Sequence, residues 1–391
     1  MGFRIRLTNF LKYNRAAYGV YYHILSTILR AIGSVLPVDN RLILFNSFAG
    51  RRFDDSPRAI FEAMKTDPRF TDYRLIWAFH NPEQFEVVGA SKIRTDTLTY
   101  FVNALKSRVW ITNSSVERGL NIHPSHTLYL NTWHGTPIKL MGSDIADGNS
   151  SFKSKGPARF DAFCVQGDYE AEIFKDCFQI PPDRILRSGL PRNDELVHYS
   201  QNRRDELRLK LNIPQDKTAL LYCPTFREYD SADGNAVAMR PPIDLFKWSH
   251  ELGNTHILLI RAHYEVTSAM EICENDFVRD VSSYPSLNEL MIAADVLISD
   301  YSSVFFDWSI TGKPMMHFCY DYDKYAKNRG MYFDVREWIS GADNEGDLIE
   351  HIKELDFASA SERTMAFRSR FVDYCGNASQ LVLDWLSEAL K

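Results

Sequence analysis

The chain has 391 residues, of which 45% are hydrophobic and 25% are charged, and its formal net charge is −6. This length exceeds what one hydrophobic core usually serves, so the composition indicates a folded protein of two domains. The acidic charge excludes a general nucleic-acid binder, because such a protein presents a basic surface to phosphate. Six scattered cysteines without a CxxC pair indicate reduced thiols in a cytosolic protein.

The first 38 residues differ from this average because they contain basic residues and no acidic ones. From residue 16 onward they are also rich in Tyr, Leu, Ile and Val. We expect residues 1–38 to form a basic amphipathic helix that lies on an anionic membrane surface. A signal peptide or a spanning helix fits less well, because His23 and Arg30 interrupt the apolar run. The alternative is a helix that packs on the protein itself and leaves its basic residues in water.

After this segment, short apolar stretches alternate with amphipathic ones. The pattern predicts strands near residues 41–47, 73–79, 108–112, 127–131, 161–165 and 184–188, and helices near 56–65, 97–106 and 168–178. Short apolar strands that alternate with helices are typical of a parallel α/β sheet with both faces covered. We therefore predict a Rossmann-like domain over residues 39–205.

Residues 196–211 are charged and helical without a core strand, and therefore suit a linker. The alternation then restarts, with strands near 218–223, 255–260, 296–299 and 314–318 and helices near 286–294, 304–310 and 363–389. We predict a second Rossmann-like domain over residues 206–391, with the final helix included. The fold class is thus α/β, with two Rossmann-like domains that face a cleft.

The stretch from Asp295 to Gly312 places a hydroxyl-rich turn between a buried strand and an apolar helix. Ser302 and Ser303 stand at the predicted start of that helix. The first backbone N–H groups of a helix lack internal partners and lie at the positive end of its dipole, so this turn suits a phosphate. The alternative is an ordinary N-cap, in which Ser or Asp only closes the helix.

Polar residues also follow three other predicted strands, at residues 133–137, 224–227 and 261–263. In open parallel sheets, ligands bind beyond the carboxyl ends of the strands, so two facing domains bring these groups into one cleft. His134 titrates near neutrality and suits a general base for a hydroxyl nucleophile, and Gly135 lets the backbone approach a ligand closely. Thr136 and Pro137 predict the start of another helix.

Arg261 and His263 alternate along one strand and therefore point to the same side, into the cleft. A protonated His263 would stabilise charge on a leaving phosphate. For His134 and His263 alike, the alternative is a structural histidine bonded to the backbone. Other cations for a diphosphate are Lys139, Arg192 and Arg227. No Walker A loop, GxGxxG fingerprint or HExxH motif stands out, so the sequence does not require a metal.

Several short motifs together resemble the CDP-glycerol glycerophosphotransferase family, which includes the teichoic-acid primases and polymerases of bacterial cell walls and capsules. Each motif is weak alone, but they stand in the family's order and span about residues 41–379. They are WHGTPIK (133–139), SGLPRND (188–194), YCPTFRE (222–228), IRAH (260–263), ISDYSSVFFDW (298–308), GKP (312–314), RGMYFD (329–334) and YCGNAS (374–379).

The resemblance implies a GT-B-like fold and peripheral attachment to the cytoplasmic face of the membrane. It also implies transfer of glycerol phosphate from CDP-glycerol to a hydroxyl of a lipid-linked or polymer acceptor, with release of CMP and without a cofactor. By carry-over, His134 is the base on the acceptor, and His263 binds or protonates the phosphate bridge. The donor would be bound by Thr225, Arg227, Arg261, Asp300, Ser302 and Ser303, and the acceptor side of the cleft lined by Gly135, Thr136, Lys139 and Arg192.

Three alternatives stay open at this point. The same chemistry with CDP-ribitol or another CDP-polyol would use the same motifs. A nucleotide-sugar glycosyltransferase or epimerase of the same architecture would act at a sugar carbon. A non-catalytic membrane-bound scaffold would not need histidines in the cleft. The sequence does not distinguish the addition of one unit from many, and it identifies neither the acceptor nor the oligomeric state.

Overall fold

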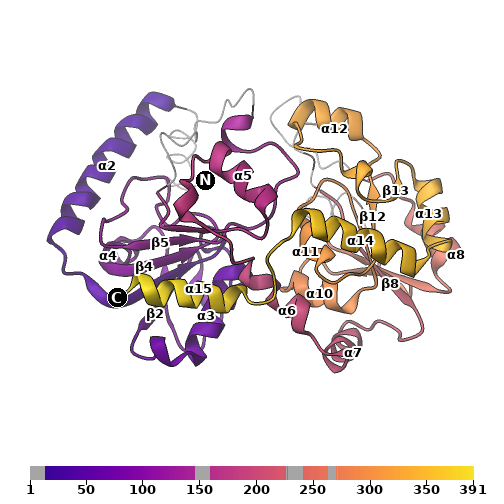
Figure 1. Ribbon diagram of the computed structural model, residues 1–391, viewed down its shortest axis with the longest axis horizontal. Helices are drawn as coiled ribbons and strands as arrows, with labels where there is room; N and C mark the ends of the chain where they lie inside the picture. Colours follow the sequence, from indigo (N-terminus) through magenta and orange to yellow (C-terminus); the bar gives the residue numbers. More distant parts are fainter. Residues whose placement is uncertain (1–13, 146–158, 226, 228–240, 263–269, 271) are drawn as a thin grey trace.

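The structure is a computed structural model that describes residues 14–145, 159–225, 227, 241–262, 270 and 272–391 (Figure 1). It contains two domains, each built on one sheet whose strand pairs are all parallel. Within the described residues, the first sheet has the order β3-β2-β1-β4-β5-β6-β7 and the second the order β10-β9-β8-β11-β12-β13. Both orders reverse after a central strand, as in the Rossmann fold, so the predicted pair of Rossmann-like domains is confirmed.

The first domain contains the elements α2 (Arg15–Val35), β1 (Asp39–Asn46), α3 (Asp55–Thr66), β2 (Arg74–Phe79), β3 (Ser91–Arg94), α4 (Leu98–Lys106), β4 (Ser107–Thr112), β5 (Leu128–Asn131), β6 (Ala162–Cys164), α5 (Asp168–Cys177) and β7 (Ile185–Leu186). The connecting helices are α6 (Asp194–His198) and α7 (Gln201–Lys210). Short 3-10 turns occur at Phe48–Gly50, Pro68–Phe70, Pro82–Gln84, Gly142–Asp144, Pro182–Arg184 and Pro191–Asn193.

The second domain contains the elements β8 (Thr218–Cys223), α8 (Leu245–Leu252), β9 (His256–Ile260), β10 (Val278–Asp280), α10 (Leu287–Ala293), β11 (Val296–Ser299), α11 (Val304–Ser309), β12 (Met315–Phe318), α12 (Tyr322–Arg329), β13 (Gly341–Ala342), α13 (Glu345–Lys353) and α14 (Phe357–Phe371). A 3-10 turn at Val335–Glu337 precedes β13, and α15 (Ala378–Ala389) ends the described chain.

The strands form where the sequence is continuously apolar, because helices cover both faces of each sheet. In β1, Ile43 and Phe45 lie in one hydrophobic cluster with residues of α3, whereas Leu44 lies in the opposite cluster with Leu29 of α2. Successive side chains of a strand point to opposite faces, so one apolar run serves two cores. This is why the central strands were predictable from sequence. Strands β3, β10 and β13 and helices α8, α12 and α13 were not predicted.

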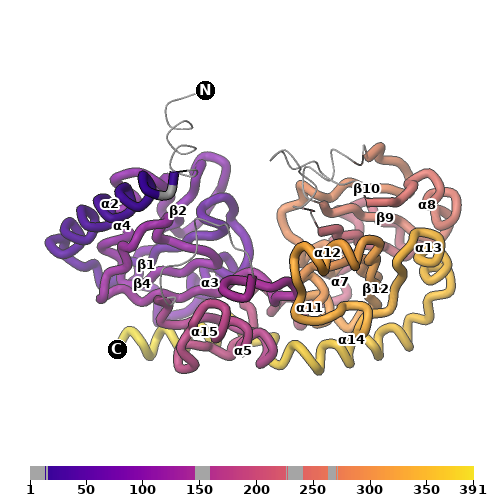
Figure 2. The backbone as a smooth tube through the Cα atoms, turned by 90° about the horizontal axis from the view of Figure 1, so that it is seen from above, coloured from indigo at the N-terminus to yellow at the C-terminus, as the bar shows by residue number. Residues whose placement is uncertain are grey.

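The final helix, α15, belongs to residues 206–391 but packs on the first domain. Val382, Leu383 and Leu386 lie in the same hydrophobic cluster as Phe61 of α3. The carboxylate of Asp194 accepts hydrogen bonds from the first two backbone N–H groups of α15, at 2.8 and 2.7 Å. In Figure 2, α14 and α15 run in sequence along one side of both domains. The chain therefore crosses between the domains twice.

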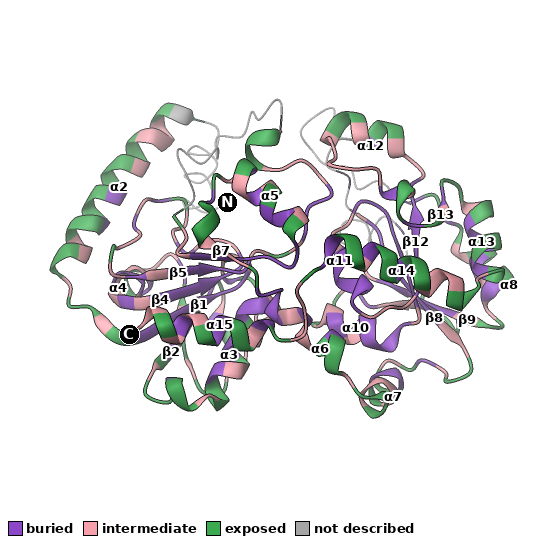
Figure 3. Cartoon of the chain, viewed as in Figure 1, coloured by how far each residue is buried: buried purple, intermediate pink, exposed green. Residues whose placement is uncertain are grey.

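Helix α2 presents apolar side chains on two faces. Its inner face places Leu29 in the core, with Leu25 and Ile32 partly buried against it, and its Ser26 hydroxyl accepts from the backbone N–H of Asn121 at 3.0 Å. Its outer face leaves four large apolar side chains exposed: Val20 (61%), Ile24 (57%), Ile28 (50%) and Val35 (79%). Figure 3 shows this outer face largely in the exposed colour. Across the described residues, no helix combines the length and apolar character needed to cross a membrane.

We predict that α15 stabilises the first domain through its buried leucines, Leu383 and Leu386. Leu383 is 1% exposed, so Leu383→Ala should lower the free energy of unfolding by about 2–5 kcal/mol, since it removes a core side chain and leaves a cavity. Urea unfolding of the full chain measures this loss. Leu381 lies on the same helix but is 41% exposed, and Leu381→Ala should change the free energy by at most about 0.5 kcal/mol. Equal losses in the two variants would contradict the packing of α15.

Candidate active site

The candidate site lies where the strand order of each sheet reverses. In the first domain this point lies between β1 and β4, and in the second between β8 and β11. Loops that leave the carboxyl ends of these strands are tied to one another. The carbonyl of the Asn113 side chain accepts from the backbone N–H of Phe48 at 2.8 Å, and the Asp300 carboxylate accepts from the backbone N–H of Thr225 at 3.0 Å. Such reversal points are where open α/β sheets bind ligands.

His134 lies in the loop after β5, where the residue as a whole is exposed but its ring packs against neighbouring aromatic rings. Its Nδ1 atom lies 2.8 Å from the backbone oxygen of Asn113. Its ring stacks on the Trp133 ring, with centroids 4.3 Å apart, and lies 5.6 Å from the Phe48 ring. Loss of water around the ring lowers the pKa of His134 below its ordinary value, although Asp55 opposes this shift. The imidazole is therefore neutral at pH 7 and fixed in orientation.

The loop that carries His134 touches the hydroxyl-rich turn of the second domain. A Cβ atom placed on Gly135 would lie 2.5 Å from the Ser303 hydroxyl oxygen, so only glycine fits this approach. The Ser302 hydroxyl accepts from the backbone N–H of Val304, at 3.3 Å, and thus closes the start of α11. The predicted strand, turn and helix between Asp295 and Gly312 are confirmed, and the turn faces the His134 loop.

Arg227 and Asp300 are buried beneath the loops that follow β8 and β11, and neither side chain lies on the surface of the second domain. Arg227 is 1% exposed, and its guanidinium pairs with Asp300 at 2.9 Å and with Asp321 at 2.8 Å. It also lies about equally close to the rings of Tyr301, Tyr320 and Tyr325, at 5.1, 5.1 and 5.0 Å. Although burial works against its charge, Asp300 and Asp321 raise the pKa of Arg227. Its charge is therefore neutralised inside the protein.

Unlike Arg227 and Asp300, Thr225 and Arg261 are not joined to each other or to a carboxylate by their side chains among the described residues. The Thr225 hydroxyl is buried and has no hydrogen-bond partner among the described residues. Arg261 is half-buried, and its Nη1 donates to the backbone oxygens of Tyr284, at 2.6 Å, and Val281, at 3.4 Å. Burial lowers the pKa of Arg261, and Arg52 of the first domain adds to this effect. His263 lies outside the described residues.

Thr136 and Arg192 lie in a buried polar network and not on the wall of the cleft. The Thr136 hydroxyl donates to Glu170 and accepts from the Gln166 amide at 2.7 Å. Arg192 pairs with Asp55 of α3 at 3.1 Å and with Asp307 of α11 at 2.8 Å. The helix predicted to start at Thr136 and Pro137 does not form, because the chain continues irregularly to Lys139. That prediction was wrong.

Lys139 joins the two domains through its main chain. It forms an antiparallel bridge with Met331, and its ammonium group lies 5.6 Å from the centre of the Tyr325 ring. The backbone N–H of the next residue, Leu140, donates to the oxygen of Gly330 at 3.1 Å. The segment after His134 is thereby attached to the second domain along several residues.

Sequence analysis missed two groups of buried polar residues. Asp55, Asp307 and Asp321 pair with Arg192 or Arg227. Gln166, Glu170 and Asn193 contact Thr136, Asp307 or each other. The one available signal was an acidic residue, Asp307, on an otherwise apolar helix. Such a carboxylate is buried only when it is paired, so it indicates a cation nearby.

The rim of the first domain also contains an unusual density of left-handed backbone. Phe48, Ala49 and Asp55 have φ values of 45°, 56° and 62°, and Trp133 has 51°. Non-glycine residues in this region carry strain, which concentrates at functional sites. All four residues flank the His134 ring or the loop that contacts it.

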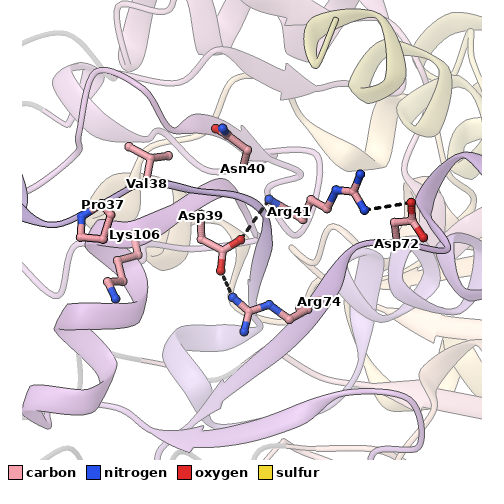
Figure 4. A pocket seen from close by; sticks show the side chains of 8 residues that line it. All are labelled: Pro37, Val38, Asp39, Asn40, Arg41, Asp72, Arg74 and Lys106. Carbon is pink, nitrogen blue, oxygen red and sulfur yellow. Dashed lines mark hydrogen bonds and ion pairs between the residues drawn. The ribbon is translucent and has the colours of Figure 1, made fainter.

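Other features of the described residues lie away from this rim. No group of three or more His, Cys, Asp or Glu is placed to hold a metal ion in the described parts of the chain. A hollow of about 400 Å³ lies at the amino ends of β1 and β2, where Arg41 pairs with Asp72 at 2.9 Å and Arg74 pairs with Asp39 (Figure 4). This edge is opposite to the one at which parallel sheets bind ligands, so we assign it no catalytic part.

Comparison with known proteins identifies the chain by sequence and by structure. The model of a family described as CDP-glycerol:poly(glycerophosphate) glycerophosphotransferase matches residues 28–388. A teichoic acid poly(glycerol phosphate) polymerase of Staphylococcus epidermidis is 34% identical over 374 residues, which cover 90% of this chain and 51% of that protein. This chain thus spans about half the length of that relative.

Two further comparisons cover nearly the full length of both proteins. A teichoic acid glycerol-phosphate transferase of Staphylococcus aureus is 32% identical over 373 residues, covering 89% of this chain and 93% of that protein. The solved structure of the wall teichoic acid polymerase TagF superposes with a TM-score of 0.83 at 31% identity, covering 97% of this chain and 98% of that chain. The GT-B-like architecture expected from the sequence is confirmed by this likeness.

We predict a stability change with pH that comes from Glu170. Burial raises the pKa of Glu170 to about 7, although Thr136 and the Gln166 backbone N–H donate to it. The acid form fits the folded state, so stability is full below about pH 4.5 and falls as pH rises through about 7. At about 1.4 kcal/mol per pKa unit, the loss reaches about 3 kcal/mol.

Chemical unfolding between pH 5 and 8 tests this prediction with Glu170→Gln as the reference. The variant lacks the titrating proton, so its free energy of unfolding should fall less than that of the unaltered chain over this range. Parallel curves for the two proteins would show that Glu170 does not titrate in the folded state near neutrality.

Proposed function

Because this chain belongs to the CDP-glycerol:poly(glycerophosphate) glycerophosphotransferase family, we propose that it transfers glycerol phosphate from CDP-glycerol to a polymer hydroxyl and releases CMP. The observation that carries the proposal is the contact between the loop of His134, an oriented neutral imidazole, and the serine turn at the start of α11. The names of the relatives support the glycerol donor over ribitol. The TagF structures include a histidine variant soaked with CDPG.

His134 has the geometry of a general base. A carbonyl oxygen only accepts hydrogen bonds, so the bond to Asn113 requires the proton on Nδ1 and leaves the lone pair on Nε2. Nε2 takes the proton of the acceptor hydroxyl, whose oxygen attacks the phosphorus that bears glycerol. The bond from that phosphorus to the bridging oxygen breaks, and CMP leaves with the electron pair. The products are a glycerol phosphodiester, CMP and one proton.

The second domain supplies charge stabilisation in this proposal. The hydroxyls of Ser302 and Ser303 bind the diphosphate at the positive end of α11, where the Val304 N–H donates to the Ser302 hydroxyl. Arg261 keeps donors beyond those bonded to backbone oxygens, and the Thr225 hydroxyl needs a partner. His263, by family resemblance, binds or protonates the phosphate bridge. Arg227 and Asp300 act beneath this surface, by fixing the loops that carry these groups.

The acceptor and the cellular location are part of the same proposal. The acceptor is a lipid-linked or polymeric chain with a free hydroxyl, as in cell-wall or capsule synthesis. The protein binds peripherally at the cytoplasmic face of the membrane through α2, whose outer apolar side chains are 50–79% exposed at Val20, Ile24, Ile28 and Val35. The basic residues that precede α2 favour an anionic surface.

We predict that His134→Gln lowers kcat for acceptor-dependent CMP release by about 10²–10⁴-fold, because it removes the base while keeping polarity. In the unaltered enzyme, kcat/KM should fall as pH drops through the pKa of His134, which lies below 6.5. Purified protein is incubated with CDP-glycerol and a glycerol-phosphate-primed acceptor, and CMP is quantified by chromatography.

His126→Gln is the matched control, because the His126 Nε2 contacts the oxygen of Leu105 at 3.1 Å, at the opposite edge of the sheet. It should retain activity. CMP from CDP-ribitol alone would change the donor and keep the mechanism. Release of UDP from UDP-sugars in place of CMP would overturn the proposed reaction.

We also predict that α2 binds anionic vesicles. The triple substitution Val20→Ser, Ile24→Ser, Ile28→Ser should weaken cosedimentation with phosphatidylglycerol vesicles at least about tenfold, since burying each such side chain contributes about 1.5–3 kcal/mol. The control is Val88→Ser with Leu98→Ser, which replaces apolar residues that are 81% and 71% exposed elsewhere on the same domain. Equal binding by both variants would exclude α2 as the membrane contact.

A further inference from the structure

A buried carboxylate of the second domain reaches into the first domain beside the candidate site. Asp307 lies on α11 and is 4% exposed. One of its oxygens accepts from Arg192 at 2.8 Å. The other accepts from the Asn193 amide at 2.7 Å and from the Gln166 amide at 3.4 Å. Both oxygens are thus held by groups of the other domain.

From Asp307, one route of contacts leads to the loop of His134. The Gln166 amide that reaches Asp307 also donates to the Thr136 hydroxyl at 2.7 Å. Thr136 is two residues after His134 and donates in turn to Glu170. Every member of this route is buried, so its hydrogen bonds are not exchanged for water.

A second route reaches the same histidine from another direction. Arg192 holds both oxygens of Asp55 at 3.1 Å. Asp55 begins α3 directly after the loop that carries Phe48, whose ring packs against His134. The two routes from Asp307 therefore end at the two segments that fix the imidazole.

At its other end, Asp307 shares a short helix with the serine turn. Ser303 precedes it by four residues, and α11 has six residues in all. A displacement of Asp307 therefore moves Ser302 and Ser303 with it. A Cβ atom on Gly135 would lie 2.5 Å from the Ser303 hydroxyl oxygen, so the two loops cannot approach each other more closely without a clash.

Stability alone does not explain this arrangement. A buried ion pair costs desolvation energy, and well-packed apolar residues often serve stability as well or better. What a carboxylate with three directed partners adds is a fixed direction and distance between two rigid bodies. Here those bodies carry the base and the phosphate-binding turn.

We propose that Asp307 is a positioning residue, which sets the separation between the His134 base and the serine turn through Arg192, Gln166 and Thr136. This inference rests on the proposed function, since it assigns a role in the same transfer. An error of about 1 Å in the position of reacting groups costs about 10²-fold in rate. Loss of the directed contacts should therefore lower kcat far more than it changes KM for the donor.

The experiment compares Asp307→Asn with Asp295→Asn in the full chain. Asp307 pairs with one arginine, and Asp295 pairs with two, Arg204 and Arg208. Asp295 precedes β11, away from the candidate site. Both substitutions remove one arginine-paired carboxylate charge and should lower Tm. We expect Asp307→Asn to lose about 10²-fold in kcat with KM changed less than about threefold, and Asp295→Asn to lose less than about threefold in either. Similar kcat losses in the two variants would overturn the proposal.

A second pair of variants covers the case in which Asp307→Asn does not fold. Thr136→Val removes the hydroxyl link with almost no change in volume and should lower kcat about tenfold, whereas Thr136→Ser keeps the hydroxyl and should recover most of that loss. Equal kcat values for the Thr136→Val and Thr136→Ser variants would show that the Thr136 hydroxyl does not help to position His134.

Hydrogen exchange separates this inference from the proposed function. If the unaltered enzyme releases no CMP, the proposed function fails, yet exchange still reports the arrangement. Asp307→Asn or Thr136→Val should speed exchange of the backbone N–H groups in residues 132–136 and 300–306, and Asp295→Asn should not. Unchanged exchange in both segments would overturn the positioning role whatever the activity.

Discussion

The arrangement of the two domains depends on the pairing of Arg192 with Asp307. Each domain has its own sheet with hydrophobic clusters on both faces, and α15 contributes to a core of the first domain. These cores do not by themselves set how the loops of the two domains meet. The side chains of this charge pair are 11% and 6% exposed and join one domain to the other, so separating the domains would leave two buried charges with fewer partners. The two surfaces of the candidate site then lie on either side of this buried pair.

The same logic explains which cations are available to substrate. Arg192 and Arg227 are both neutralised by two carboxylates inside the protein, so they hold loops in place. Arg261 donates to two backbone oxygens, and among the described residues no carboxylate lies at pairing distance from its guanidinium group. A site that binds a diphosphate needs a cation that is held in a fixed orientation but is not already paired with a carboxylate. Buried pairs provide the orientation, and the remaining donors provide the binding.

The sequence predicted the elements whose structure follows from the local residue pattern alone. Continuous apolar runs such as 43–45 and 296–298 predicted the central strands, and the turn between Asp295 and Gly312 was found with its helix nearly as expected. It was uninformative where the cause lies far along the chain. The partners of Arg192 and Arg227 are up to 137 residues away, so both arginines resembled free ligands for phosphate. Edge strands of two residues, such as β13, bury too little to leave a pattern.

The path of the chain limits how the cleft can open. The first crossing between domains follows Asp194, and the second returns to α15, whose first N–H groups bind the carboxylate of Asp194 itself. The backbone oxygen of Gln166 accepts from Asp373 and Tyr374 at 2.8 and 3.0 Å, next to the second crossing. Gln166 also contacts Asp307. The two crossings and the Asp307 network thus share residues, so a motion that separates His134 from the serine turn must disturb contacts at the crossings as well. Any change in the separation of these two loops is therefore coupled to the contacts where the chain passes between the domains.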